Sequence, residues 1–294
     1  MQSMLTPRGP AADAIAELSW VLFAGGAAIL LLVVAAIAYA LWSKPARLSR
    51  ESFVVAAGIA FPVVVLSALL AYAYAIGERL HPDPEPELRI EITGEQWWWR
   101  VRYLDAAGKP EFETANEVRI PAGRPVELEL RSADVIHSFW VPQLGGKVDM
   151  IPGRTNRLRM KSSSEGLYRG QCAEFCGGPH ALMALHVVAQ SADDFRTWTE
   201  SQTRPAASGN ALFHARCAAC HAVRGTDAAG TRGPDLTHVA GRLFIAAGTL
   251  PNTPGNMAGW LADSQHAKPG NLMPSMGLGA AELQSLSAYL ASLK

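Results

Sequence analysis

The stretch Cys172-Ala-Glu-Phe-Cys-Gly-Gly-Pro-His-Ala-Leu-Met183 gathers several metal-binding side chains within twelve residues. It offers two thiolates, the imidazole of His180 and a thioether, and a further imidazole, His137, lies well upstream. These soft to borderline ligands suit copper or zinc and not calcium or magnesium. A structural zinc site would close a tetrahedron from two cysteines and two histidines, but Met183 is a copper-type ligand that zinc seldom uses. A mononuclear blue-copper site uses one cysteine, so the additional cysteine would allow two thiolates to bridge two coppers.

The sequence before this motif alternates between apolar and polar residues, as half-buried strands do. The alternating segments are residues 88–92, 97–103 and 126–130, and turn signals lie at 107–108, 121–123 and 144–146. We expect an all-β domain, an antiparallel sandwich, that ends near Val188. Ser191 and Asp194 form a capping-box pattern that predicts a short helix from Asp193 to about Ser201. Residues 204–209 are typical of a linker.

The stretch Cys217-Ala-Ala-Cys220-His221 follows the C-x-x-C-H pattern of haem c attachment, in which the adjacent histidine ligates iron. A redox cysteine pair or a chance match is also compatible with it. The neighbouring stretch Asn271-Leu-Met-Pro274 favours haem, because a Met/His axial pair gives a six-coordinate iron suited to electron transfer. Met273 is the expected sixth ligand, Met276 is also available, and Met257 is a weaker choice. An even number of cysteines in an exported domain first suggests disulfides, but both local sequences favour metal or haem binding.

The last 85 or so residues predict a small helical domain with little core of its own. They are rich in alanine and glycine and close in a helix with Leu283, Leu286 and Leu290 at helical spacing. Phe213 and Tyr289 are expected to pack where the first and last helices cross. A domain of this size usually needs a metal or cofactor for stability, and the haem motif supplies one.

Two apolar runs near the N-terminus predict a membrane hairpin. Residues 18–43 and 52–77 contain no charged residue, and each helix would span ~39 Å against a hydrocarbon core of ~30 Å. Lys44, Arg47 and Arg50 between the runs place their loop in the cytoplasm, so both termini lie outside. Residues 1–17 lack a basic segment followed by an apolar one, so we expect no cleavable signal there.

Charge argues against a nucleic-acid partner. The chain carries 26 Lys and Arg against 26 Asp and Glu, a formal net charge of zero, so it has no broad basic surface.

In this order, the motifs resemble subunit II of cytochrome c oxidase with its binuclear CuA centre, and the C-terminal haem motif resembles the fused cytochrome c of caa-type oxidases. The resemblance implies a multidomain membrane protein: a two-helix transmembrane hairpin, an all-β cupredoxin-like sandwich and an all-α class I cytochrome c domain. The implied side-chain ligands of the two coppers are His137, Cys172, Cys176, His180 and Met183. The resemblance also implies copper ligation by the Glu174 carbonyl and magnesium at the boundary with subunit I on its carboxylate.

The resemblance assigns the remaining cofactor residues as well. The implied haem c residues are Cys217, Cys220, His221 and Met273. The run Gln96-Trp-Trp-Trp99 is similar to an aromatic patch beside CuA, which implies that electrons enter at Trp97; the alternative is that Trp97 and Trp99 fill the sandwich core. A glutamate that the family places about two turns before a proline in the second span is missing near Val55, and Glu51 is the nearest acid.

These expectations amount to a hairpin segment 1–83, a copper domain 84–200 and a cytochrome domain 205–294. We expect an electron-transfer subunit in the bacterial inner membrane, with two spans and both termini and soluble domains in the periplasm. Electrons would pass from haem c to CuA and on to the oxygen-reducing haem-copper site in subunit I, coupled to proton translocation. The expected partners are subunit I and other oxidase subunits, lipid, and an external cytochrome c or cytochrome bc complex as donor. The alternatives are a subunit of a CuA-containing nitric oxide or nitrous oxide reductase and a membrane copper carrier.

The remaining histidines, 81, 186, 214, 238 and 266, have no partner pattern, so we expect them at surface or strand positions. Asp134 and Asp149 lie in segments that resemble the family, and each fits a hydrogen bond near copper and a plain surface charge equally well.

Overall fold

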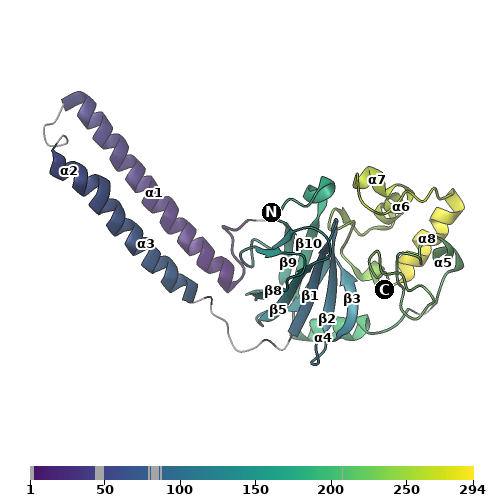
Figure 1. Cartoon of the computed structure of the whole chain (residues 1–294). Coiled ribbons are helices and arrows are strands. Elements are labelled where there is room, and N and C mark those ends of the chain that lie inside the picture. The colour runs from purple at the N-terminus through teal and green to yellow at the C-terminus, as the bar shows by residue number, and fades with distance from the viewer. Residues whose placement is uncertain (1–2, 44–49, 79, 81–85, 87, 207) are drawn as a thin grey trace.

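The computed structural model describes residues 3–43, 50–78, 80, 86, 88–206 and 208–294. Figure 1 shows an elongated helical hairpin, a β-sandwich and a C-terminal helical domain that lies against the sandwich. The basic loop residues Lys44 and Arg47, the proline-rich connector 81–85 with His81, and the expected boundary at residues 83–84 lie outside the described residues.

The hairpin pairs α1 (Pro10–Ser43) with a second helix from Glu51 to Glu78. The second helix consists of α2 (Glu51–Val55), a π-helical turn η1 (Ala56–Ala60) and α3 (Phe61–Glu78). Both helices are long and apolar enough to cross a bilayer, and their apolar stretches are not buried against the rest of the chain. They are therefore unlike the core helices of a soluble domain. α1 begins before the expected span because Pro10 suits a first helical turn and Asp13 complements the positive end of the helix dipole.

The start of α1 is fixed to the sandwich by the residues before it. Arg8 N donates to Gln143 O, and Ser163 N donates to Arg8 O, both at 2.7 Å. Gly9 approaches the main chain so closely that a Cβ there would lie 2.3 Å from Lys161 O. The hairpin is thus joined to the sandwich by packed main chain as well as by the connector.

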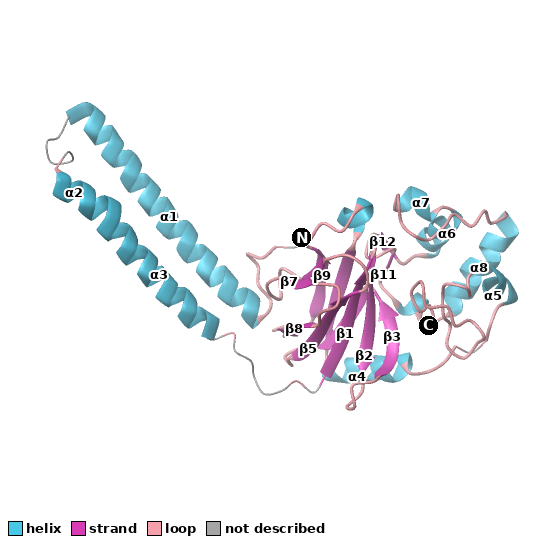
Figure 2. Ribbon diagram, in the orientation of Figure 1, coloured by secondary structure: helices cyan, strands magenta, loops and turns pink. Residues whose placement is uncertain are grey.

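The sandwich consists of two five-stranded sheets, ordered β3-β2-β1-β5-β8 and β4-β10-β9-β6-β7 (Figure 2). The strands of the first sheet are β1 (Leu88–Glu95), β2 (Trp98–Leu104), β3 (Pro110–Ala115), β5 (Val126–Ser132) and β8 (Asn156–Met160). Those of the second are β4 (Glu117–Pro121), β6 (His137–Trp140), β7 (Val148–Met150), β9 (Gly166–Cys172) and β10 (Ala184–Gln190). The inward faces form one core that includes Ile90, Ile92, Trp99, Val101, Leu128, Leu130, Phe139 and Val187.

The all-β sandwich is confirmed, but the expectation of a purely antiparallel arrangement is wrong at two pairs. β1 pairs with β5 in parallel, and so does β4 with β10. Two strands of one sheet can pair in parallel only where the chain between them returns to the same end of the sheet through a crossover connection. Period-two alternation indicates which side chains face the core and carries no information about the direction of the neighbouring strand.

Helix α4 (Ala192–Gln202) leads from the sandwich to the C-terminal domain. Ser191 Oγ accepts a hydrogen bond from Asp194 N at 3.1 Å, which is the expected N-cap. The domain itself contains α5 (Ala211–Arg216), η3 (Val239–Gly241), α6 (Pro254–Ala262), α7 (Ser264–Ala267), α8 (Ala280–Ser292) and a short sheet of β11 (Phe244–Ile245) and β12 (Leu250–Pro251). The expected contact between Phe213 and Tyr289 is present, with ring centroids 5.4 Å apart.

Candidate metal and haem centres

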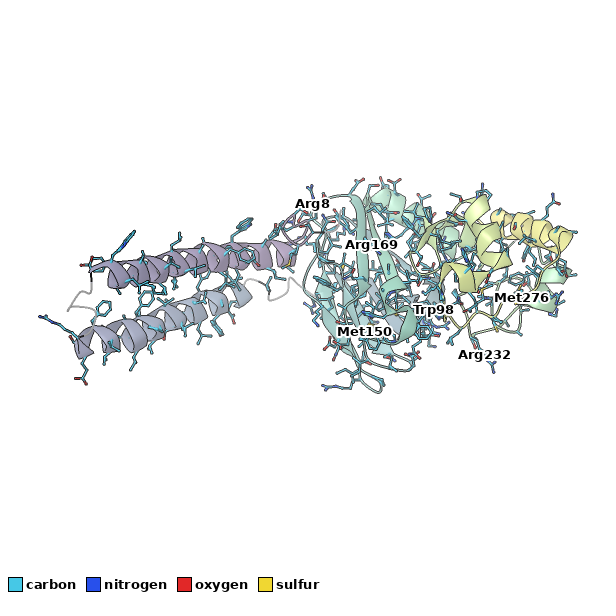
Figure 3. All side chains as sticks on the ribbon, turned by 90° about the horizontal axis from the view of Figure 1, so that it is seen from above. Arg8, Trp98, Met150, Arg169, Arg232 and Met276 are labelled. Atoms are coloured by element: carbon cyan, nitrogen blue, oxygen red, sulfur yellow. The ribbon has the colours of Figure 1, made fainter. Side chains whose placement is uncertain are left out.

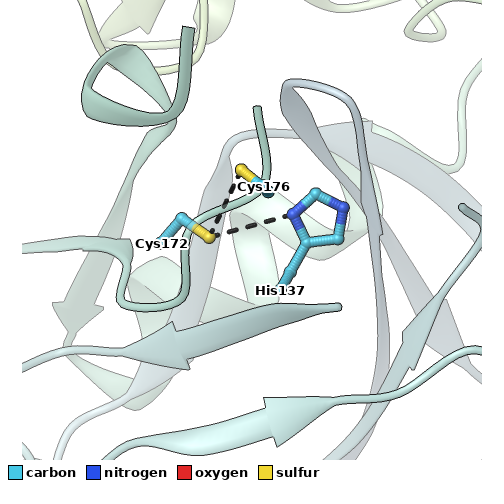
Figure 4. A group of neighbouring side chains, drawn as sticks. All are labelled: His137, Cys172 and Cys176. Carbon is cyan, nitrogen blue, oxygen red and sulfur yellow. Dashed lines mark hydrogen bonds between the residues drawn. The ribbon is translucent and has the colours of Figure 1, made fainter. Parts of the chain in front are cut away.

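The residues of the first motif converge at one end of the second sheet. His137 opens β6, Cys172 closes β9, and the following loop returns through a short helix, η2 (Gly178–Leu182), to Met183, the residue just before β10. Figure 4 shows His137, Cys172 and Cys176 facing one another. Ligand atoms of these three side chains all lie within 4.8 Å of each other, and all three residues are buried. The sandwich therefore brings His137, which is distant in the sequence, next to Cys172 and Cys176.

The geometry gives each sulfur its own imidazole. The Sγ atoms of Cys172 and Cys176 are 3.8 Å apart and form no disulfide. His137 Nδ1 lies 3.8 Å from Cys172 Sγ, and His180 Nδ1 lies 3.4 Å from Cys176 Sγ. Two further donors approach: Met183 Sδ lies 3.8 Å from Cys176 Sγ, and the Glu174 carbonyl oxygen lies 3.2 Å from Cys172 Sγ. All six predicted residues meet here, and thiols, imidazoles and a thioether are donors that fit copper.

Asp134 orients the more deeply buried imidazole. Its carboxylate lies 2.8 Å from His137 Nε2, which directs Nδ1 toward the cysteines. Gln96 N donates to the same carboxylate at 2.7 Å. Burial alone would lower the pKa of His137, but the hydrogen bonds to Asp134 and Cys172 raise it to about 9. Of the two readings of Asp134, the structure supports the hydrogen bond near the metal ligands.

The two thiols shift each other's pKa in opposite directions. Hydrogen bonding from Cys176 lowers the pKa of Cys172, and the same contact raises the pKa of Cys176. Cys172 is therefore the thiol that loses its proton more readily, and a metal that binds both sulfurs must displace the proton of Cys176.

The second motif lines a large cavity between the C-terminal domain and the sandwich, since residues of both domains border it. Cys217, Cys220, His221 and Met273 all border a space of about 820 Å³, a volume in the range of cofactor sites. Much of its wall is apolar, with Phe213 among the lining residues. The cavity and its donor set fit a covalently attached haem.

A hydrogen bond to the main chain fixes the ring of His221. Its Nδ1 lies 2.8 Å from Pro234 O, so Nδ1–H donates and Nε2 is left for iron. Burial lowers the pKa of His221, which keeps the imidazole neutral. Gly233 packs on the ring so closely that a Cβ there would lie 2.6 Å from Cε1.

Three methionines, Met257, Met273 and Met276, border this cavity, and neighbouring side chains fix the main chain of Met273. Met273 N donates to Asn271 Oδ1 at 2.8 Å, and Met273 O accepts hydrogen bonds from Ser264 Oγ at 2.9 Å and Gln265 Nε2 at 2.8 Å. Met276, labelled in Figure 3, also lies on the cavity wall. Met273 therefore lies on the cavity wall with a fixed main chain and stays the predicted sixth ligand.

The three consecutive tryptophans have different environments. Trp99 is fully buried in the sandwich core. Trp98 carries the Arg100 guanidinium 4.7 Å from its ring centroid. Trp97 lies half-buried on the wall of the haem-sized cavity, and its Nε1–H donates to Cys176 O at 2.9 Å. Gly177, whose φ is 115°, gives the indole room, since a Cβ there would lie 3.0 Å from Trp97 Cζ2. One side chain thus touches both candidate centres.

The buried positions of three polar residues, His238, His186 and Lys268, were not predicted. His238 was expected at a surface or strand position, and it is buried in a turn with its ring nitrogens 2.8 and 2.9 Å from Lys294 O and Arg204 O. His186 is a strand residue, as expected, but it is buried against the C-terminal domain. Lys268 is buried and donates to Trp97 O at 2.5 Å. No local pattern marks these three residues, because their partners are distant in sequence.

Comparisons with known proteins agree with this architecture. The family "Cytochrome C oxidase subunit II, periplasmic domain" matches residues 102–191, and the family "Cytochrome c" matches residues 206–294. Cytochrome c oxidase subunit 2 of Alkalihalophilus pseudofirmus is 37% identical over 248 residues, covering 79% of this chain and 70% of that protein. The protein of the same name from Bacillus sp. strain PS3 is 30% identical over 256 residues, covering 80% of this chain and 70% of its own.

Among solved structures, the crystal structure of the periplasmic domain of subunit II of cytochrome oxidase from Bradyrhizobium japonicum is similar. It is 33% identical, covers 40% of this chain and 95% of its own, and has a TM-score of 0.38. The identity and coverage of the two sequence relatives, together with both family matches, settle the assignment. This chain belongs to the cytochrome c oxidase subunit 2 family, the members of which are subunits of an oxidoreductase complex, and it carries a fused cytochrome c domain.

Proposed function

We propose that this chain carries electrons from a haem c in residues 205–294 to a binuclear CuA centre in residues 84–200, and from there to the oxygen-reducing haem-copper site of subunit I. The complex would couple this transfer to proton translocation. The observation that carries the proposal is the position of Trp97, which borders the haem-sized cavity and donates its indole N–H to the carbonyl of Cys176. A single aromatic side chain bridging both candidate centres suits electron transfer between them.

The proposed copper ligands are the side chains of His137, Cys172, Cys176, His180 and Met183 and the carbonyl of Glu174. Bound there, two coppers would supply a one-electron carrier. The contribution of the chain is rigidity: β6, β9 and β10 hold the donors, and Asp134 fixes the His137 ring. A carrier whose ligands stay in place between oxidation states needs little rearrangement.

The proposed haem residues are Cys217 and Cys220 for covalent attachment and His221 and Met273 as axial ligands. The haem would supply a second one-electron carrier with no open coordination position. Pro234 O orients His221, and the hydrogen bonds to the Met273 main chain hold the opposite wall of the cavity.

The membrane location and the partners of the subunit are also part of the proposal. We propose residues 1–83 as the anchor in the bacterial inner membrane, with both termini and both soluble domains in the periplasm. Subunit I and other oxidase subunits, lipid, and an external cytochrome c or cytochrome bc complex as donor are the proposed partners. A magnesium ion on the Glu174 carboxylate at the boundary with subunit I is proposed from the family resemblance.

Oxygen uptake tests the proposed function. The complex that co-purifies with this chain from its native membrane in mild detergent would be supplied with an artificial electron donor, with and without cyanide. We expect rapid cyanide-sensitive uptake that is lost in Cys176→Ser and kept in Leu167→Ala, which changes an exposed residue on the strand that bears Cys172. A complex loaded with haem and copper that consumes no oxygen would refute the oxidase assignment and favour a nitrogen-oxide reductase.

A further inference from the structure

The cytochrome domain meets the copper domain along a polar seam whose described hydrogen bonds lie in two groups. Away from the cavity, Leu243 N donates to the buried Glu117 at 2.8 Å, and Thr249 Oγ1 donates to Leu182 O at 3.3 Å. Beside the cavity, Arg100 of the copper domain donates to Thr231 O at 2.8 Å. In the opposite direction, Lys268 of the cytochrome domain donates to Trp97 O at 2.5 Å.

Lys268 is an unusual residue to find in this seam. It follows the four-residue helix α7, is only 3% exposed, and pairs with no carboxylate among the described residues. Burial lowers the pKa of its ammonium to about 7. A buried amine is costly unless its hydrogen bonds are satisfied, and the ammonium of Lys268 donates to the main-chain carbonyl of Trp97.

Trp97 is therefore held from both domains. On the copper side its Nε1–H bonds Cys176 O, and its ring lies over Gly177. On the cytochrome side Lys268 bonds its carbonyl. A residue fixed at its main chain and at its ring has little freedom to rotate away from the cavity wall.

We propose that Lys268 is a positioning residue for electron transfer: by bonding the Trp97 carbonyl, it holds the Trp97 indole between the haem cavity and Cys176. This inference rests on the proposed function, in which Trp97 lies on the route between the centres. Its chemistry is a charge-assisted hydrogen bond between domains, and Lys268 acts through Trp97 from its own place on the cavity wall.

The test is a double-mutant cycle on the full chain, loaded with haem and copper in detergent. The haem is reduced by a flash, and the haem-to-copper transfer rate is followed by absorbance. Lys268→Met, which keeps the side-chain volume, is expected to slow transfer on the order of tenfold. In a Trp97→Phe background the same substitution is expected to add no further slowing, because it acts through the indole. Thr249→Val, which removes a seam hydrogen bond away from Trp97, is the matched control and is expected to keep the wild-type rate.

Hydrogen exchange provides a readout independent of transfer. In Lys268→Met, amides of residues 96–98 should exchange roughly tenfold faster or more, whereas Thr249→Val should leave them unchanged. The proposal is overturned if Lys268→Met matches the wild type in rate and exchange, or if it slows transfer equally in both backgrounds, which would indicate domain docking alone. Absence of haem-to-copper transfer in the loaded wild type would refute the proposed function, and the exchange of residues 96–98 would still decide whether Lys268 holds Trp97.

Discussion

Acidification is expected to destabilise this chain through His186, which lies on β10 where the two soluble domains meet. Its ring stacks on Phe244 of the cytochrome domain, with centroids 3.8 Å apart and an interplanar angle of 8°. His186 is 4% exposed, and its Nδ1 has no hydrogen-bond partner among the described residues. Burial, with a smaller effect of the Arg169 charge, lowers the pKa of His186 from 6.5 to about 4, because an imidazolium there would lose its hydration.

The direction and size of the effect follow from proton linkage. Between pH 6.5 and pH 4 the unfolded chain binds more protons at this site than the folded one, so stability is full above this window and is lost as the pH falls. At about 1.4 kcal/mol per pH unit, the pKa gap limits the loss to roughly 3.4 kcal/mol, of which roughly 2 kcal/mol falls between pH 7 and pH 4.5. Attraction of the cation to the Phe244 ring is worth about 0.5–1 kcal/mol and does not offset this loss.

Urea unfolding of the full chain in detergent, followed by tryptophan fluorescence at pH 7 and pH 4.5, measures the effect. On acidification, the free energy of unfolding of the wild type is expected to fall by roughly 2 kcal/mol more than that of His186→Leu, which lacks the titrating ring. His266→Leu changes an exposed histidine and is expected to keep the wild-type pH dependence. An equal loss in the wild type and in His186→Leu would refute the reasoning.

Three further substitutions test other parts of the structure. Asp134→Asn removes the charge that orients His137 and should speed copper loss to a chelator by roughly tenfold to a hundredfold; unchanged retention would contradict the orienting role. Phe213→Ala empties a site that is 2% exposed, so the cytochrome domain should lose roughly 3–5 kcal/mol, read from haem absorbance in urea, and an unshifted midpoint would count against this core. Gly9→Ala places a Cβ 2.3 Å from Lys161 O and should cost at least about 1 kcal/mol in thermal unfolding; a wild-type melting curve would show that the junction yields.

The residues expected at each centre could be proposed from the sequence because most of the ligand-type side chains lie only a few positions apart. Cys172 to Met183 form one local motif, and Cys217 to His221 another, so the fold has only to close each loop. His137 is distant from the first motif, and the structure places it there because β6 and β9 are neighbours in one sheet. Patterning predicted the strands, but it could not predict which strands pair in parallel.

Residues that join the domains could not be predicted, because each has a partner far along the chain. Lys268 bonds Trp97 across 171 positions, and nothing near Lys268 distinguishes it from a surface lysine. His186 and His238 are similar cases, since each is buried by a segment that folds onto it from elsewhere. The spacing of residues in the sequence indicates a site that forms within one segment. Contacts between two domains depend on how the folded domains pack, which the spacing does not indicate.

The hydrogen bonds described across the seam share a property with a consequence for mutational tolerance. Each uses a main-chain group on at least one side: Lys268 and Arg100 donate to the carbonyls of Trp97 and Thr231, and Glu117 accepts from an amide. A carbonyl is present whatever the side chain, so Thr231 can be exchanged for many residues without loss of its bond, whereas Arg100 cannot. Random substitution along the seam should therefore be tolerated unequally. A substitution of the residue that supplies the side chain should remove the hydrogen bond, whereas a substitution of the residue that supplies the main-chain group should leave it in place.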